Sequence, residues 1–173
     1  MRDAVAAGLE ALSPPDDCPP SEWAEAHIRI TDGDRVGPMS FGRGYEFQRE
    51  MVDAFFGPFR PGEQRRVGVA YKGAQSGVTL LCQAGLLYWT AARQVSAFHL
   101  MPREFDATDK AKRLAEMIDA EPYLRREFPP GLLRVRKTRG GQSLRVAYSN
   151  SQAELKNWQA GVGVFDGVDE LEG

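Results

Sequence analysis

The sequence holds few of the residues that build covalent or metal-centred scaffolds. It has two cysteines, Cys18 and Cys82, and two histidines, His27 and His99. No Cys or His stands near either cysteine at a metal-ligand spacing, which excludes a disulfide framework and a structural zinc site. We therefore expect Cys82 to be a core thiol and Cys18 a loop residue. His99 lies inside a predicted strand with no acid at a telling spacing, so we expect a packed core residue without a catalytic role.

Long apolar runs and a surplus of one charge are also missing. The most apolar run, 78–92, is shorter than the roughly 20 residues that a membrane span needs, and Gln83 interrupts it. No secretory signal opens the sequence, so we expect a cytoplasmic protein without a membrane partner. The net charge of -2 argues against a protein whose whole surface coats nucleic acid, although a local basic stripe remains compatible with it.

Proline divides the chain into two parts. Residues 1–20 combine a helical segment with a proline-rich linker, and residues 21–173 are expected to form one domain. In that domain segments with helical and strand patterns alternate, which predicts an α/β fold whose mostly parallel sheet is covered by helices. The expected helices are 21–25, 45–56, 78–92 and 104–120; the expected strands are 65–71, 95–101, 143–148 and 161–165; and 31–44 is expected to be loop.

The stretch from 72 to 79 has the composition of a phosphate-binding loop between a strand and a helix. Such a loop needs small residues whose backbone N–H groups surround phosphate oxygens, a helix amino-terminus, and a hydroxyl for Mg²⁺. Thr79 stands at the hydroxyl position, whereas Val78 occupies the usual lysine position and Lys72 opens the loop instead. The alternative is a glycine-rich turn with a purely structural role. The predicted loop comprises Lys72, Gly73, Ala74, Gln75, Ser76, Gly77, Val78 and Thr79.

Two further segments fit a nucleotide site. The apolar run 162–165 ends in Asp166, which at the carboxyl end of a strand could hold Mg²⁺ beside the phosphate loop. Upstream of the loop, Phe47 could stack on adenine and Gln48 could hydrogen-bond its edge. The alternatives are that Asp166 follows an ordinary core strand, and that Phe47 is a core residue with Gln48 on the surface.

A basic segment lies between these motifs, around Gly140 and Gly141. It could contact the phosphate backbone of double-stranded DNA, or it could be a solvated hairpin or loop. Its cations are Arg134, Arg136, Lys137, Arg139 and Arg145.

In this order, the segments resemble the large terminase subunits of lambda-like bacteriophages, in which an ATPase motor precedes a nuclease. The similarity runs from about Ser21 to Leu171. The matching pieces are Ser21–Ala24 for the family's opening, Phe47–Met51 for its adenine segment, 72–79 for its deviant phosphate loop with lysine first, Ser149–Ser151 with Leu155 for the segment before the magnesium strand, and Phe165–Asp169 for that strand's Asp-Glu-Val-Asp ending.

The resemblance implies a P-loop NTPase fold of the RecA-like (ASCE) type with ATP and Mg²⁺ as cofactors. Lys72 and Asp166 would be catalytic, and Thr79 with Asp166 would hold the metal. The implied partners are double-stranded DNA, a terminase small subunit, a portal and further copies of the chain, in the cytoplasm of a bacterial host.

Two departures from the family stand out. The catalytic glutamate that follows the family's Asp is Gly167 here, and the nearest replacements are Asp169 and Glu170. Packaging motors also need further strands and a nuclease domain, so we expect the domain to be incomplete at its carboxyl end, as a fragment of a longer protein or a degraded prophage reading frame.

The leading hypothesis is therefore the ATP-binding motor region of a viral DNA-packaging enzyme, which couples ATP hydrolysis to DNA translocation into a prohead. This chain alone could be inactive, so the alternative is a non-catalytic nucleotide-binding or assembly module. A helicase-type ATPase built on the same core is a third reading.

Overall fold

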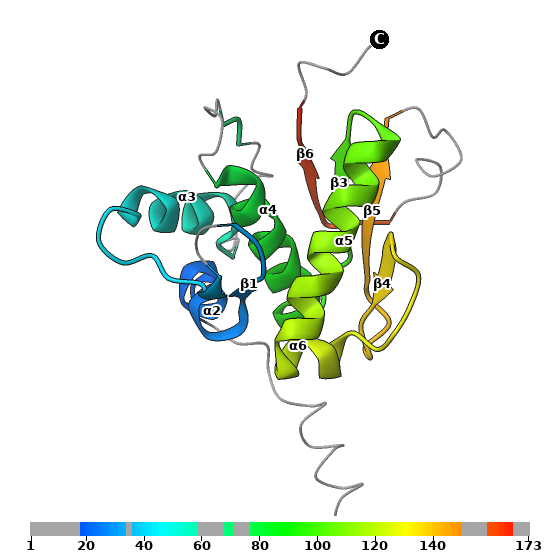
Figure 1. Cartoon of the computed structure of the whole chain (residues 1–173), viewed down its shortest axis with the longest axis horizontal. Coiled ribbons are helices and arrows are strands. Elements are labelled where there is room, and N and C mark those ends of the chain that lie inside the picture. Colours follow the sequence, from blue (N-terminus) through cyan, green and yellow to red (C-terminus); the bar gives the residue numbers. More distant parts are fainter. Residues whose placement is uncertain (1–17, 34–35, 59–67, 71–76, 150–158, 168–173) are drawn as a thin grey trace, which may run out of the picture.

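A four-stranded sheet forms the centre of the structure. The structure, a computed structural model, describes residues 18–33, 36–58, 68–70, 77–149 and 159–167. The strands lie in the order β4-β5-β3-β6, with β3 parallel to both β5 and β6 and with β4 antiparallel to β5 (Figure 1). Their bounds are β3 (Ala97–Met101), β4 (Val135–Lys137), β5 (Ser143–Tyr148) and β6 (Val162–Phe165).

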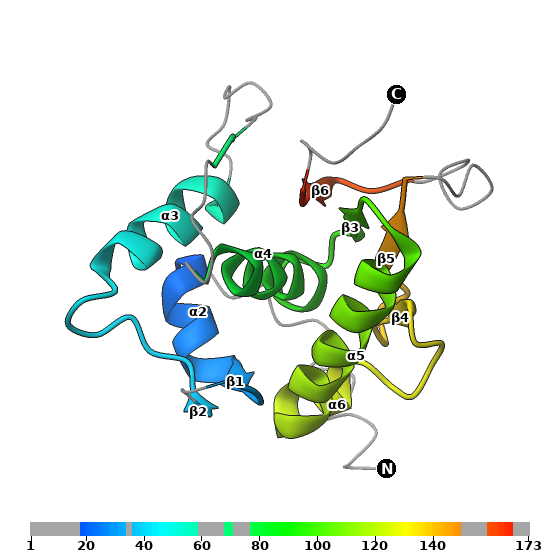
Figure 2. The same cartoon turned by 45° about the horizontal axis from the view of Figure 1, so that its top comes forward.

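Helices α4 and α5 lie side by side against one face of this sheet (Figures 1 and 2). Helix α4 contacts β3 and β6, and α5 contacts β3 and β5. Helices α2 and α3 pack on the far side of α4, so three layers follow one another. Their bounds are α2 (Pro20–His27), α3 (Glu46–Phe56), α4 (Val78–Leu87) with the π-helix η1 (Tyr88–Ala92) continuing it, α5 (Glu104–Ala120) and α6 (Pro122–Glu127); a small antiparallel pair, β1 (Arg29–Ile30) and β2 (Gly37–Pro38), precedes α3.

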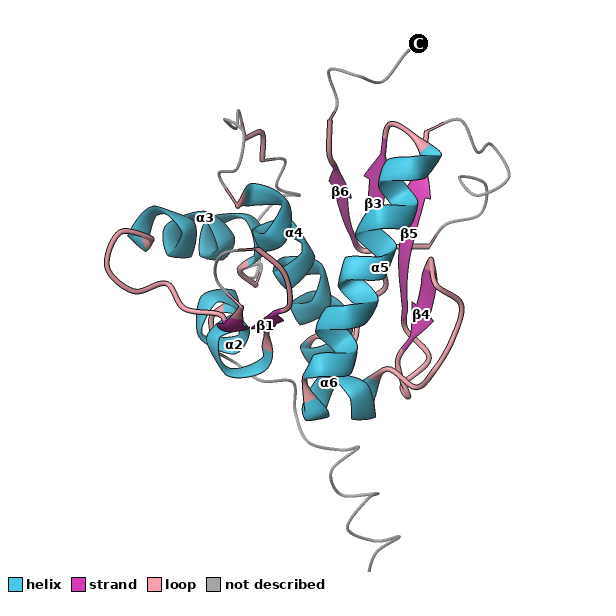
Figure 3. Ribbon diagram, in the orientation of Figure 1, coloured by secondary structure: helices cyan, strands magenta, loops and turns pink. Residues whose placement is uncertain are grey.

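The position of α4 in the middle layer explains its composition. A helix covered on both sides can be apolar all round, whereas a surface helix needs a polar face. Leu81, Ala84 and Leu87 are at most 2% exposed, in keeping with the apolar run at 78–92. Helix α5 runs along the sheet (Figure 3). It has one buried side, which includes Ala107, Ala111, Leu114 and Ile118, and charged residues on its other side, as an amphipathic surface helix should.

Helices α3 and α4 approach closely at one glycine. A β-carbon at Gly85 would lie 2.3 Å from the ring of Phe56, so only glycine lets the α3 ring rest on the α4 backbone. The indole Nε1 of Trp89 donates a hydrogen bond of 2.9 Å to the carbonyl of Phe56 and ties the same two segments together. This contact sets the position of α3, whose first turn carries Phe47 and Gln48.

The α/β prediction is confirmed at the level of a helix-covered sheet that contains parallel pairs. The predicted helices 45–56, 78–92 and 104–120 and the strand 143–148 are found within one residue, and the basic segment forms the β4–β5 hairpin. The helix predicted at 21–25 runs on to His27. None of the described helices is long and apolar enough to cross a bilayer.

Three details of the prediction were wrong. The strand expected at 65–71 is absent from its described part, 68–70, because these residues have no ladder partner in the described chain. Strands β3 and β6 begin two and one residues later than expected, where pairing to their neighbours starts. The loop 31–44 contains β2, because its backbone pairs with β1. The helix at 78–92 is confirmed, and its last five residues have π geometry. The helix expected at the start of the chain lies outside the described residues.

Replacing Gly85 with alanine should loosen the α3–α4 contact. We expect Gly85→Ala to lower the free energy of unfolding by about 1–3 kcal/mol, because the added methyl group must displace the Phe56 ring from a packed core. Urea denaturation followed by circular dichroism measures this change. The control is Gly42→Ala, where the nearest atom, Oγ of Ser40, lies at an ordinary 3.6 Å. Equal stability of the two variants would contradict this account of the packing.

Candidate nucleotide-binding site

The amino-terminus of α4 meets the carboxyl end of β6 through one hydrogen bond. The hydroxyl of Thr79, in the first turn of α4, donates to Oδ2 of Asp166 at 2.9 Å. The backbone N–H of Asp166 donates to the carbonyl of Leu100 at 3.0 Å, so Asp166 continues the pairing of β6 with β3 by one residue. The two predicted magnesium residues, 87 positions apart in the sequence, are thus brought together.

The turn that opens α4 requires glycine. Gly77 is the N-cap residue with φ +77°, in the left-handed region that side-chain-bearing residues rarely adopt. Its carbonyl accepts the first helical hydrogen bond, from the N–H of Leu81 at 3.1 Å. The chain therefore enters α4 through a sharp turn, with the amino-terminal N–H groups of the helix directed away from its body.

Gln48 of α3 lies against this turn. A β-carbon at Gly77 would stand 2.9 Å from Nε2 of Gln48, and the Gln48 residue is 9% exposed. Its neighbour Phe47 is 51% exposed. The reading that placed Phe47 in the core and Gln48 on the surface is therefore wrong, because the α3–α4 packing turns Gln48 inward and Phe47 outward.

The chemistry of the Thr79–Asp166 pair suits Mg²⁺. Both side chains offer hard oxygen atoms, which Mg²⁺ prefers. A hydroxyl has one proton and two lone pairs, so Thr79 can donate to Asp166 and still present a lone pair to a cation. In the part of the chain that the structure describes, no cluster of three or more His, Cys, Asp or Glu could hold a metal by itself. A magnesium ion here would need phosphate oxygens and water to complete its shell, as is usual for Mg²⁺ bound with a nucleotide.

Several predicted site residues lie outside the described residues, and their roles stay predictions. These are Lys72, Gly73, Ala74, Gln75 and Ser76 of the loop, and the two carboxylates Asp169 and Glu170. Of the described loop residues, Gly77 and Thr79 stand at the site, and Val78 is a buried residue at the start of α4.

His99 is the residue that the sequence analysis missed. It is 1% exposed in the middle of β3, and its Nε2 lies 3.8 Å from Oδ2 of Asp166. The prediction that it is buried in a strand is confirmed, but its acid partner lies 67 residues away, on a strand that only folding brings alongside. The available signal was a lone polar residue within the apolar run Ala97–Met101.

The backbone at Gly167 is unsuited to the glutamate that the resemblance would place there. Gly167 has φ +68°, and a β-carbon on it would lie 2.9 Å from Cγ of Pro102, a ring atom with little freedom to move. The chain therefore turns immediately after Asp166 in a conformation that disfavours any side chain.

The basic segment does not form one continuous stripe. Residues that are cross-strand partners share a face of the sheet, and successive residues alternate between faces. Lys137 therefore lies on the same face as Arg145, while Arg134 and Arg136 lie on the other. Arg134 there reaches Oε1 of Glu104 at 3.8 Å and stands over the Tyr148 ring.

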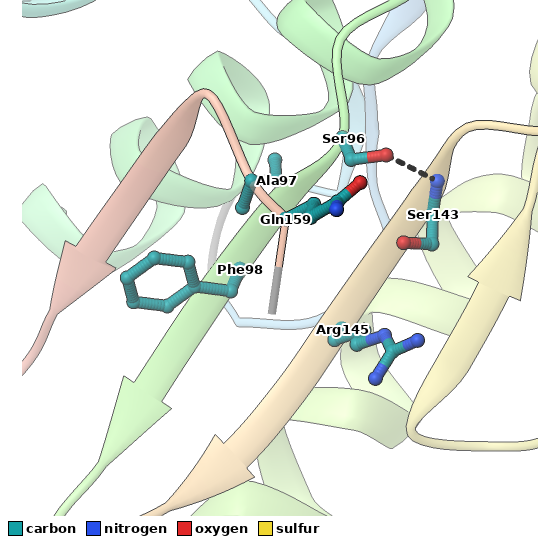
Figure 4. Close-up of a pocket in the computed structure, with 7 residues that line it drawn as sticks. Ser96, Ala97, Phe98, Ser143, Arg145 and Gln159 are labelled. Atoms are coloured by element: carbon teal, nitrogen blue, oxygen red, sulfur yellow. Dashed lines mark hydrogen bonds between the residues drawn. The ribbon is translucent and has the colours of Figure 1, made fainter. Parts of the chain in front are cut away.

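An open pocket of about 250 Å³ lies at the amino ends of the parallel strands, whereas Asp166 lies at their carboxyl ends. It lies at the amino ends of β3 and β5, where the N–H of Ser143 donates to Oγ of Ser96 at 3.1 Å (Figure 4). Phe98 and Arg145 are paired positions on these strands, and their side chains point away from each other. Ligands of open α/β sheets bind at the carboxyl ends of the strands, so we place the candidate site at Asp166 rather than in this pocket.

Comparison with known proteins adds no family to these observations. Neither a scan against models of protein families nor a search of curated proteins matches this chain. The resemblance to terminases therefore rests on the motifs themselves.

A side chain at Gly167, in the turn after Asp166, should destabilise the protein through two effects, the strained φ and the contact with Pro102. Gly141 isolates the first effect, because it has φ +89° but open space around it, and we expect Gly141→Ala to cost about 1 kcal/mol. Gly167→Ala should cost more, about 1–3 kcal/mol, because it adds the contact with Pro102 to the strained φ. Thermal unfolding of both variants measures the difference, and a Gly167→Ala protein as stable as wild type would show that the turn tolerates a side chain.

Proposed function

We propose that the chain binds ATP·Mg²⁺ at the amino-terminus of α4. The observation that carries this proposal is the hydrogen bond from Thr79 to Asp166, which pairs a helix-terminal hydroxyl with a strand-terminal carboxylate. That pair offers oxygen ligands to a divalent cation beside backbone N–H groups that suit an anion. A nucleoside triphosphate with its metal supplies both charges in one ligand.

Each described residue of the site has a distinct part in the proposal. Gly77 gives the turn that exposes the helix amino-terminus, and Thr79 and Asp166 hold the metal. Gln48, against Gly77, would hydrogen-bond the base edge, and the exposed Phe47 ring would stack on the base. Lys72 would neutralise phosphate charge from the start of the loop.

The wider function we propose follows the resemblance to phage terminases. The order of the motifs along the chain and a helix-covered sheet with parallel strands support an ATPase region of the RecA-like P-loop type. In a packaging motor, such a region would couple ATP hydrolysis to the movement of double-stranded DNA, with a small subunit, a portal and further copies as partners. The basic segment is divided between two faces of the sheet. The proposed contact with DNA is therefore supported by the resemblance alone.

A second candidate function is a nucleotide-binding module without turnover. Gly167 favours it, because its left-handed backbone and the nearby Pro102 ring oppose a glutamate at the position where the family has its general base. Binding of ATP·Mg²⁺ would then serve assembly or a conformational change rather than work.

Removing the hydroxyl of Thr79 should abolish the contribution of Mg²⁺ to ATP affinity. We expect Thr79→Val, which keeps the branched shape, and Asp166→Asn to weaken ATP binding about 10–100-fold in Mg²⁺ but to change it little in EDTA. Isothermal titration calorimetry in the two buffers measures this. The control is Asp109→Asn, which removes a surface carboxylate paired with Arg113. If wild-type protein binds ATP equally with and without Mg²⁺, the proposed metal site is refuted.

Hydrolysis by the chain should be slow. Because a general base typically contributes about 10²–10⁴-fold and Gly167 offers none, we expect a turnover on the order of 0.1 s⁻¹ or less. Phosphate release measures the rate, with Lys72→Ala as the background. A turnover of tens per second that Glu170→Gln or Asp169→Asn removes would contradict the non-catalytic reading and identify the base.

A further inference from the structure

His99 stands in an apolar position with its polar atoms unused. Its side chain is 1% exposed, and both ring nitrogens are buried without a hydrogen-bond partner in the described part of the chain. On the neighbouring strands its partners are Val146 and Val164, both apolar. An aromatic hydrocarbon side chain would fill this space without burying unpaired nitrogens, so packing alone does not explain an imidazole here.

The imidazole is directed toward the candidate metal site. Its Nε2 lies 3.8 Å from Oδ2 of Asp166, the atom that accepts the hydrogen bond of Thr79. This separation is less than 1 Å longer than an N–H···O hydrogen bond of about 2.9 Å, so a small rotation of either side chain closes it. An ionised carboxylate has about four acceptor positions, so Asp166 can accept from Thr79, ligate a metal and accept a third bond.

We propose that His99 is a positioning residue for Asp166, which donates an N–H from Nε2 to the carboxylate and fixes its orientation toward the magnesium of the bound nucleotide. The inference rests on the proposed ATP·Mg²⁺ site. Carboxylates that hold metals are themselves commonly hydrogen-bonded, and loss of such a partner typically weakens metal binding about 10–100-fold. His99 touches neither nucleotide nor metal, so its effect passes through Asp166.

Two amide substitutions separate this role from simple packing. The side-chain amide of Gln places its nitrogen near the Nε2 position of histidine, whereas the shorter Asn places its nitrogen near Nδ1. We therefore expect His99→Gln to retain most of the Mg²⁺-dependent gain in ATP affinity and His99→Asn to lose about tenfold of it. Affinity for ATP in EDTA should be the same in both variants and in wild type.

A readout without nucleotide tests the contact itself. The sequence has two histidines, and the ring of His27 lies 4.4 Å from that of Tyr123, away from the site. In long-range ¹⁵N–¹H spectra we expect His99 to carry a proton on Nε2, and Asp166→Asn to shift that nitrogen signal while the His27 signals stay unchanged. A proton found on Nδ1 alone, or a His99 signal that ignores Asp166→Asn, would overturn the proposal even if the Asn variant fails to fold.

The outcomes distinguish the two proposals. If wild-type protein shows no Mg²⁺-dependent ATP binding, the proposed function fails and the role of His99 fails with it. If wild type binds ATP·Mg²⁺ and His99→Asn binds it equally well, only the role of His99 is overturned. If both variants weaken ATP equally in Mg²⁺ and EDTA, His99 acts on the fold and the proposal is likewise overturned.

Discussion

The hydrogen bond between Thr79 and Asp166 joins two parts of the molecule that no local interaction connects. One end lies in the first turn of the buried helix, and the other directly follows β6, at one edge of the sheet that the described strands form. Because α4 also packs against β3, β6 and α3, the position of this helix determines where the hydroxyl, the turn at Gly77 and the Gln48 amide meet. The candidate site is therefore a consequence of how the middle layer is packed.

Two glycines, Gly85 in α4 and Gly167 directly after Asp166, influence how the site is assembled. Gly85 allows the Phe56 ring to rest on the α4 backbone, which brings the first turn of α3 toward Gly77. Gly167 turns the chain directly after Asp166, beneath Pro102 at the end of β3. The first brings Gln48 to the candidate site, and the second ends the segment that carries Asp166 without a side chain. The proposed nucleotide binding without rapid turnover is consistent with both.

A buried polar side chain, His99, lies next to the candidate site. A sheet interior normally excludes unpaired nitrogens because their desolvation is costly. His99 nevertheless occupies the central strand, below a carboxylate that is 11% exposed at its side chain. Thr79 contacts Asp166 at 2.9 Å, and Asp166 lies 3.8 Å from His99, so three polar side chains follow one another between helix and sheet. A charged ligand bound beside Thr79 and Asp166 would account for this arrangement.

Periodicity and composition determined much of this protein: the helices at 45–56, 78–92 and 104–120, and the strand at 143–148. The motifs also selected Thr79 and Asp166, which the structure brings together. These features are written in local patterns, because apolar spacing and turn residues act over a few positions. Only the tertiary structure decided that Gln48 is inward and Phe47 outward, that 68–70 has no strand partner in the described chain, that alternation splits the basic segment, and that His99 faces Asp166. Each of these depends on which elements become neighbours, and His99 and Asp166 are neighbours although 67 residues separate them in the sequence.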